Sequence, residues 1–313
     1  MRAVVIEQFG PPESLQVRDL PTPAPGEGEV LVRVHAAGVN AIDRLTRAGQ
    51  GVAVSRFPAV LGWDVSGVVT ATGPGVDGLP VGSEVFGMGG FPRLIGGYAQ
   101  YAVVAADALA RKPGVIDHAT AAATPMPALT AWQTVVTHAR VAAGQRVLVH
   151  GAAGGVGHLA VQLAAGAGAH VIGTASTRSH DLVSALGASE VIDYTRQPVE
   201  AVVRDADVVV DPIGGDIAVG LLATLRPGGL LVTLKGRNPR LESAAAEHGV
   251  RLAFTYVTPD GAAMARVAQL LGDGRLRVEV QQVFPLEQAA TAHAIGERGH
   301  VRGRLVLNTL DAA

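Results

Sequence analysis

The hydrophobic positions in the first third of the chain form short runs that predict β-strands. The runs alternate with polar residues or are rich in β-branched ones, and glycine or proline bounds them. Predicted strands cover 3–7, 29–36, 65–72 and 98–104, and the turn-rich stretch 21–27 (PTPAPGE) is expected to be a surface loop.

The pattern changes near residue 117, where apolar residues follow a helical period as far as 139. Pro125 and Pro127 interrupt this period, which predicts a short first helical piece and a longer second one. Strands are then predicted at 145–150, 169–174, 190–193, 207–210, 229–234 and 251–256, alternating with helices at 156–167, 180–186, 215–225, 241–248 and 261–271.

Apolar, non-alternating strands separated by helices are typical of a parallel sheet covered on both faces. We therefore expect an α/β fold with a Rossmann doubly wound parallel sheet. Residues 278–308 predict strand, helix, strand, and they either extend this second domain or return to the first.

Composition narrows the function classes. The 313 residues suffice for two domains, and the net charge of -2, without a basic stripe carrying aromatics, excludes nucleic acid or a membrane surface as an expected partner. There is no cysteine, which removes disulfides, thiolate metal ligands and a cysteine nucleophile. No apolar run reaches the ~20 residues of a membrane span. The N-terminal residues lack a signal-peptide pattern, so a cytoplasmic location is expected.

The most informative motif follows the predicted strand 145–150. It is a glycine-rich turn that opens a helix: Gly151, Ala152, Ala153, Gly154, Gly155, Val156 and Gly157. In a dinucleotide site such glycines permit a tight turn and a close approach to the pyrophosphate, which the helix N-terminus attracts. The alternative is a plain strand-to-helix turn.

The end of the next strand bears on the choice of cofactor. An NAD site usually carries an acid there for the ribose 2′-OH, but no acid lies between Val171 and His180. Thr174, Ser176 and Arg178 are present instead, and arginine pairs well with a 2′-phosphate, which favours NADPH. Alternatively, Ser179 caps the next helix and Arg178 is a solvated charge. Tyr194 either flanks the adenosine ribose or is a half-buried core residue.

Several motifs in order carry a family resemblance: 37–43 (AGVNAID), 61–69 (LGWDVSGVV), 96–101 (GGYAQY), 129–132 (LTAW), the turn at 151–157, 211–215 (DPIGG) and 299–304 (GHVRGR). With these motifs the chain resembles the quinone-oxidoreductase-like, zinc-independent branch of the medium-chain dehydrogenases and reductases. The match covers nearly the whole chain and is specific for the fold, but not for a substrate.

The resemblance implies a GroES-like β-barrel catalytic domain formed by 1–115 and 275–313, with a Rossmann NADP-binding domain, 116–274, inserted between its pieces. It also implies a homodimer, often with the Rossmann sheets joined edge to edge. By similarity, the nicotinamide would lie in the cleft. The residues implied around it are Asn40, Thr130, Ile213 and Gly214, with Leu234 and Phe254 nearby.

The resemblance also bears on metal. The zinc alcohol dehydrogenases have Gly-His-Glu where this chain has Gly62, Trp63 and Asp64, and their cysteine ligands are missing. The ten histidines form no matched cluster, so we expect no metal site. Without zinc as a Lewis acid, hydride transfer to an already electrophilic acceptor remains feasible.

One stretch departs from the family pattern. Some of these quinone reductases carry a tyrosine shortly after the asparagine at position 40, but residues 44–47 (RLTR) contain none. Asn40 and Asp43 are left as polar catalytic candidates, with Asp43 either a helix-start carboxylate or a general acid. Trp63 either walls the acceptor pocket or belongs to the core.

These observations predict an NADPH-dependent reductase of a small electrophilic substrate, a quinone or an α,β-unsaturated carbonyl. Two alternatives stay open: an enoyl-thioester reductase of a biosynthetic pathway, or a cofactor-binding regulatory protein with little turnover.

Overall fold

A computed structural model describes residues 1–310 and divides the chain into two compact units. Among these residues, unit 1 contains Met1–Met126 and 258–310, and unit 2 contains Pro127–Val257. The sequence placed these boundaries at 115 and 275, and the last three residues of its second piece lie outside the described residues. The first boundary moves because the helix α2 (His118–Ala122) packs on unit 1. The second moves because the helix α9 (Gly261–Gly272) packs on unit 1: a Cβ built on Gly261 would come within 2.0 Å of the Asp107 carbonyl oxygen.

Unit 2 contains a six-stranded parallel sheet with the order β11-β10-β9-β12-β13-β14. The chain starts in the middle at β9, winds to one edge and then crosses to build the other half, so the predicted doubly wound sheet is confirmed. The strands are β9 (Arg146–Val149), β10 (His170–Ala175), β11 (Glu190–Asp193), β12 (Ala206–Asp211), β13 (Leu225–Thr233) and β14 (Arg251–Phe254).

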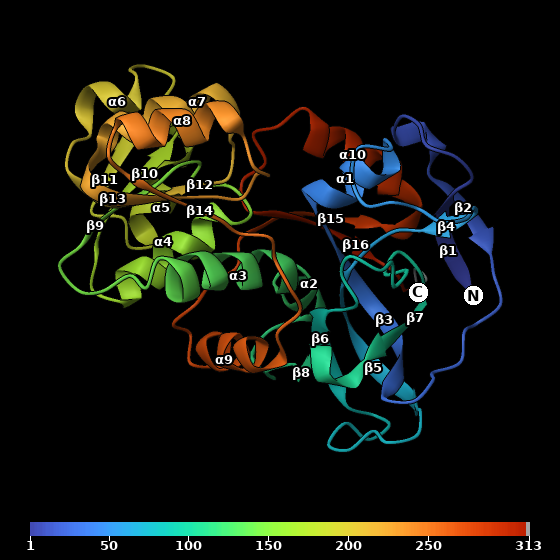
Figure 1. Cartoon of the computed structure of the whole chain (residues 1–313). Helices are drawn as coiled ribbons and strands as arrows, with labels where there is room; N and C mark the ends of the chain where they lie inside the picture. Colours follow the sequence, from blue (N-terminus) through green and yellow to red (C-terminus); the bar gives the residue numbers. More distant parts are fainter. Residues whose placement is uncertain (311–313) are drawn as a thin grey trace. The chain divides into compact units, whose positions relative to one another are not determined.

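Helices cover both faces of this sheet. Figure 1 shows α6, α7 and α8 gathered on one side and α4 on the other. Continuous apolar strands fit between two helical layers, because both faces of β9 and β12 are buried, as at Val147, Leu148 and Val209. The helices are α4 (Gly157–Gly166), α5 (His180–Ala185), α6 (Val199–Val202), α7 (Gly215–Leu221) and α8 (Pro239–Glu247).

The predicted interrupted helix is confirmed as a short and a longer piece. These are α2 (His118–Ala122) and α3 (Pro125–Trp132), which continues as a π-helical stretch to His138. Both prolines lie in the first turn of α3, where a missing N–H costs no helical hydrogen bond.

Unit 1 is built on mostly antiparallel strands. Its larger sheet has the order β15-β16-β3-β5-β6-β8, with β7 also paired to β3, and a smaller sheet has the order β2-β1-β4. The strands are β1 (Arg2–Ile6), β2 (Gln16–Asp19), β3 (Glu29–Val39), β4 (Ala59–Val60), β5 (Asp64–Thr72), β6 (Glu84–Met88), β7 (Tyr101–Ala105), β8 (Leu109–Arg111), β15 (Val280–Pro285) and β16 (Arg304–Asn308).

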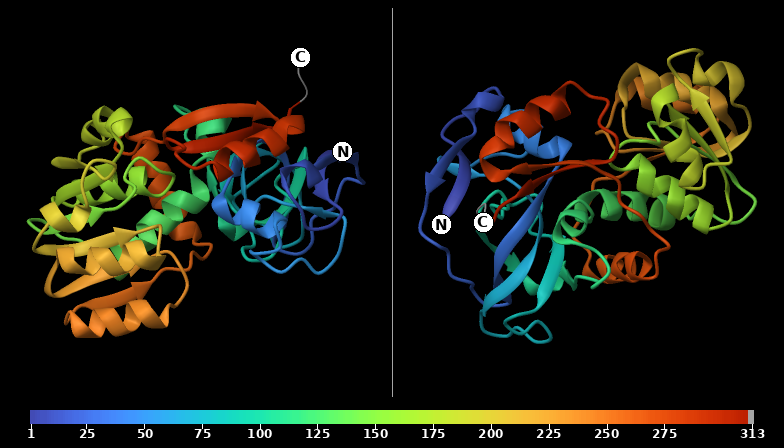
Figure 2. Two further views of the ribbon diagram at one scale, coloured as in Figure 1. Left: turned by 90° about the horizontal axis from the view of Figure 1, so that it is seen from above. Right: turned by 180° about the vertical axis from the view of Figure 1, so that it is seen from behind.

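The end of the chain returns to the beginning. β16 pairs antiparallel with β3, and the views in Figure 2 show the segment from β15 to β16 beside the N-terminal strands. Two further helices of unit 1, α1 (Ala41–Arg47) and α10 (Ala289–Glu297), contact one another. Within residues 1–310, no helix has the length and apolar character needed to cross a bilayer.

The strand β14 lies at the edge of the unit 2 sheet, and this position leads to a prediction about dimerisation. An edge strand that is rich in apolar residues is a liability unless another strand covers it. We expect two chains to pair along β14, so light scattering at micromolar concentration should give the mass of two chains and should fall toward one on dilution. A single-chain mass at every concentration would contradict the prediction.

Candidate functional site

The predicted cofactor residues of unit 2 gather at one edge of its sheet. With the exception of Thr130, which lies on α3, each stands at or just beyond the carboxyl end of a strand: Gly151 after β9, Thr174 in β10, Tyr194 after β11, Ile213 after β12, Leu234 after β13 and Phe254 in β14. We call this rim the carboxyl edge. In open α/β sheets ligands bind outside this edge, where the strand order reverses, here between β9 and β12.

The glycine turn, Gly151–Gly157, connects β9 to α4 under tight steric limits. Gly151 has φ +62°, and the Gly154 N–H donates to the Gly151 carbonyl oxygen at 2.9 Å. A Cβ on Gly157 would lie 2.2 Å from that same oxygen, so only glycine fits. The first i→i−4 bond runs from His158 N–H to the Gly154 oxygen, which leaves the amides of residues 155–157 at the helix start, as an anionic ligand requires.

Thr174 holds the glycine turn in place through hydrogen bonds to Gly151 and Ala152. Its hydroxyl oxygen accepts the Gly151 N–H at 3.0 Å and lies 2.9 Å from His150 Nδ1, and its side chain is fully buried. Its carbonyl oxygen accepts the Ala152 N–H at 2.9 Å. Thr174 therefore holds the turn, whereas in the loop that follows Ser176 is half-buried and Thr177 and Arg178 are exposed.

A carboxylate that the sequence analysis did not consider also reaches this loop. Asp193, at the end of β11, accepts hydrogen bonds from the Thr177 hydroxyl and from the Thr195 hydroxyl and amide. These donors lower the pKa of Asp193 to about 2. Ser179 stands at the N-cap of α5 but makes no capping hydrogen bond, while Arg178 is exposed.

Tyr194 is exposed and meets the His150 ring edge-on with centroids 6.2 Å apart, so it is not a core residue. Burial lowers the pKa of His150. His150 thus links the glycine turn, Thr174 and Tyr194 as an uncharged side chain.

The loop after β12 is held by a buried carboxylate. Asp211 accepts the amides of Ile213 and Gly214 at 3.0 Å each and the Thr233 hydroxyl at 2.9 Å. Gly214 has φ +78°, and a Cβ there would meet the Lys235 side chain at 2.5 Å. Ile213 is thereby presented at the surface of the carboxyl edge.

In unit 1 the two predicted catalytic residues stand at the start of α1. Asn40 is the N-cap, and Asp43 accepts its backbone N–H at 2.6 Å. The Asn40 side chain joins a buried ion pair: its Nδ2 donates to Asp64 at 2.9 Å, and its Oδ1 accepts from Arg304 at 2.7 Å. Asp43 is fully buried and serves as the helix-start carboxylate.

Burial raises the pKa of both carboxyls, to about 7 for Asp43 and about 6 for Asp64. Asp64 accepts from Asn40, the Met126 amide and Arg304, whereas Oδ1 of Asp43 has no hydrogen-bond partner. We conclude that Asp64 carries the charge opposite Arg304 and that Asp43 holds its proton more readily.

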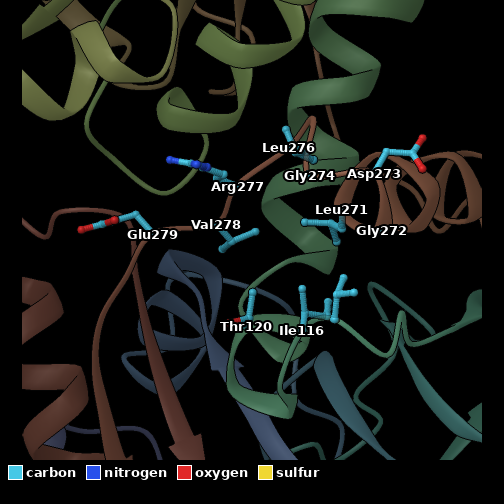
Figure 3. Close-up of a pocket in the computed structure, with 11 residues that line it drawn as sticks. Ile116, Thr120, Leu271, Gly272, Asp273, Gly274, Leu276, Arg277, Val278 and Glu279 are labelled. Atoms are coloured by element: carbon cyan, nitrogen blue, oxygen red, sulfur yellow. The ribbon is translucent and has the colours of Figure 1, made fainter.

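Trp63 belongs to the core. It is fully buried, its Nε1 donates to the Arg93 carbonyl oxygen at 2.8 Å, and its ring packs against Phe91. Unit 1 also has a cavity of about 580 Å³, walled by α2, the end of α9 and the segment before β15. Arg277 and Glu279 extend to one side of this cavity and Asp273 to the other (Figure 3). None of the predicted catalytic or cofactor residues lines it.

Residues 1–310 contain no group of three or more His, Asp or Glu side chains that could hold a metal ion.

Sequence reasoning missed His150, Asp193 and Asp211 at the carboxyl edge, and Asp64 and Arg304 in unit 1. Asp211, Asp64 and Arg304 lie inside motifs that carried the family resemblance. A carboxylate or guanidinium within a largely apolar motif indicates a buried polar contact, and this pattern could have identified them. Asp193 offers no such signal, because it comes from a different strand than the glycine turn.

Comparison with known proteins identifies relatives over the whole length. Residues 26–114 match the model of the alcohol dehydrogenase GroES-like domain, and residues 186–307 match a model described as zinc-binding dehydrogenase. The chain is 32% identical to the mitochondrial NAD(P)H oxidoreductase RTN4IP1 of Danio rerio over 90% of this chain and 84% of the relative. The predicted GroES-like domain is thereby confirmed.

Two of the solved structures that are similar to the chain are quinone oxidoreductases. The quinone oxidoreductase of Coxiella burnetii is 36% identical, with a TM-score of 0.93 over 98% of this chain and 99% of that one. The quinone oxidoreductase of Escherichia coli, complexed with NADPH, is 27% identical, with a TM-score of 0.89 over 98% of this chain and 100% of that one.

The steric limits of the glycine turn lead to a prediction that compares two variants, Gly154→Ala and Gly157→Ala. In Gly154→Ala the new Cβ lies 3.2 Å from the Gly151 oxygen, so the turn needs only a small shift, while a bound pyrophosphate would meet the methyl group. We expect a near-normal melting temperature and an affinity for NADPH that is about 5- to 150-fold weaker, since overpacking costs about 1–3 kcal/mol.

Gly157→Ala is the control, because its Cβ would clash with the turn itself at 2.2 Å, so stability and affinity should fall together. The two properties are measured by thermal melting and calorimetry. A Gly154→Ala protein that binds NADPH normally would show that the pyrophosphate lies elsewhere.

Proposed function

Because the chain belongs to the quinone-oxidoreductase-like, zinc-independent branch of the medium-chain dehydrogenases and reductases, we propose that it is an NADPH-dependent reductase. Its substrate would be a quinone or an α,β-unsaturated carbonyl. When bound, the nicotinamide supplies the hydride, and the protein supplies position and electrostatics.

The observation that carries the proposal is the glycine turn at the reversal point of the sheet. Its steric limits are set by the Gly151 oxygen, and its open amides precede His158 on α4. A dinucleotide pyrophosphate fits this chemistry: it is an anion, it needs a close backbone approach, and the positive end of the helix dipole stabilises it. Thr130, Ile213, Gly214, Leu234 and Phe254 remain the proposed contacts of the nicotinamide half.

The preference for NADPH rests on the loop after β10. Ser176 is half-buried and Arg178 is exposed there, and the carboxylate that reaches this loop, that of Asp193, is engaged by Thr177 and Thr195. A carboxylate occupied in this way is not presented to a ribose 2′-OH. Arg178 supplies the donor geometry that matches a 2′-phosphate.

The acceptor end is proposed to involve Asn40 of unit 1. No tyrosine occurs in α1, and Asp43 is turned into the capping of that helix. A small electrophile that already withdraws electrons needs a hydrogen-bond donor more than a strong acid. The cytoplasmic location stays a prediction, since the Danio rerio relative is named as mitochondrial.

The choice of cofactor is tested by Arg178→Ala. NADPH should bind the unchanged protein more tightly than NADH. The variant should lose about tenfold or more in NADPH affinity, since a charge-assisted hydrogen bond contributes about 1.5–3 kcal/mol, while NADH binding should be unchanged. Arg266→Ala on α9, the same substitution at an exposed arginine of unit 1, is the control. Equal calorimetric affinities for the two cofactors in the unchanged protein would refute the assignment.

The reaction is tested with an acceptor panel. NADPH oxidation should occur with quinones or α,β-unsaturated ketones. Because the proposed reaction does not use a catalytic zinc ion, the activity should persist after prolonged treatment with a chelator. Turnover only with enoyl thioesters would favour the biosynthetic alternative. NADPH binding without turnover on any member would favour the regulatory one. One zinc ion retained per chain in elemental analysis would overturn the zinc-independent chemistry.

A further inference from the structure

The side-chain amide of Asn40 has its orientation dictated by two neighbours of opposite character. Arg304 can only donate hydrogen bonds, and its Nη2 lies 2.7 Å from Oδ1 of Asn40. An ionised Asp64 can only accept them, and its Oδ2 lies 2.9 Å from Nδ2 of Asn40. Turning the amide over would place its NH₂ group against the guanidinium and its oxygen against the carboxylate. Both contacts would then be repulsive.

The two neighbours are themselves fixed by backbone groups. Oδ1 of Asp64 accepts the Met126 amide at 2.9 Å, and Nε of Arg304 donates to the Ala123 carbonyl oxygen at 3.0 Å. Asp64 is fully buried, and Arg304 is buried apart from a small fraction. A buried pair with these additional hydrogen bonds has one arrangement, because removing either partner would strand a charge in the core.

This arrangement leaves the Asn40 amide with one specific capacity. Its oxygen is used by Arg304, and one of the two protons on Nδ2 is used by Asp64. The second proton of Nδ2 is the group that remains for a ligand. Asn40 can therefore donate a hydrogen bond to a bound molecule through Nδ2, while Arg304 already occupies its oxygen.

Building on the proposed function, we propose that Asp64 and Arg304 are positioning residues that make Asn40 a donor to the carbonyl oxygen of the acceptor. The acceptor class is then a compound whose electrophilic carbon is conjugated with a carbonyl group, so that the electron pair can move through the double bond to the carbonyl oxygen. Hydride adds to the carbon, the carbonyl oxygen gains negative charge, and the Nδ2 proton stabilises that charge without being transferred. Solvent supplies the proton that completes the reduction.

The test is the double variant Asp64→Asn/Arg304→Gln. Both new side chains keep a donor and an acceptor for the Met126 amide and the Ala123 carbonyl, so the hydrogen-bonded frame is preserved without charge. With these bonds kept, the new amide at position 64 turns its NH₂ toward Asn40 and the one at position 304 turns its oxygen toward it, so the two neighbours favour the reverse orientation of the Asn40 amide. With 1,4-benzoquinone and an α,β-unsaturated ketone as probes, kcat should fall at least about tenfold, since a lost oxyanion donor costs on the order of a hundredfold or more.

Two controls separate positioning from stability and from cofactor binding. The single variant Arg304→Lys keeps a cation that can only donate beside Oδ1 of Asn40. Its kcat should therefore stay close to that of the unchanged protein and above that of the double variant. The nucleotide fragment 2′,5′-ADP lacks the nicotinamide, so its affinity should be equal in all variants. If the unchanged protein neither binds 2′,5′-ADP nor reduces either acceptor, the proposed function fails.

A readout that is independent of turnover tests the positioning alone. In NMR of ¹⁵N-labelled protein, one Asn40 side-chain proton should be protected from solvent exchange and the other should exchange faster. The double variant replaces the charged acceptor Asp64 by a neutral one, so the protected proton should exchange faster. A folded double variant with unchanged kcat, or an unchanged protein whose two Asn40 protons exchange alike, would overturn the inference.

Discussion

The buried pair of Asp64 and Arg304 is the interaction on which unit 1 depends. The two residues are 240 positions apart, and their contact ties β5 to the returning strand β16. Removing two charges from water is costly, and attraction alone does not offset it, so the neighbouring hydrogen bonds are part of the reason the pair is stable. Those bonds reach Asn40, Ala123 and Met126, the last residue before unit 2. One polar cluster therefore fixes both the end of unit 1 and its candidate acceptor contact.

Unit 2 depends on a steric constraint instead. The Gly151 carbonyl oxygen is approached so closely that a Cβ at Gly157 has no room, and Thr174 fills the space under the turn with a hydroxyl bonded to Gly151. The same constraint that shapes the turn places the open amides of α4 at its rim. In this unit the candidate dinucleotide site is determined by backbone geometry. In unit 1 the candidate acceptor contact, Asn40, is instead oriented by the charged side chains of Asp64 and Arg304.

The parts of the fold that were predictable are those whose signal is local. Strands of the parallel sheet are continuous apolar runs, and the glycine turn follows one of them directly. The short strands β6 and β8 and the seven-residue α1 have little pattern of their own and exist because neighbours pair or cap them. The apolar period of α9 predicts a helix but does not show on which unit the helix packs. For this reason the second domain boundary was predicted at 275, after α9, although α9 packs on unit 1. Sequence spacing also cannot show that the Thr174 hydroxyl faces the turn or that Asp193 reaches Thr177 from another strand.

The central claim is that a nicotinamide dinucleotide binds at the carboxyl edge of unit 2. Hydrogen exchange of backbone amides, measured by mass spectrometry with and without NADPH, tests it most directly. The account predicts that NADPH slows exchange in the peptide covering the glycine turn and the first turn of α4, with a second protected region around Ser176 and Arg178. Unchanged exchange at the glycine turn, with protection confined to unit 1, would contradict it.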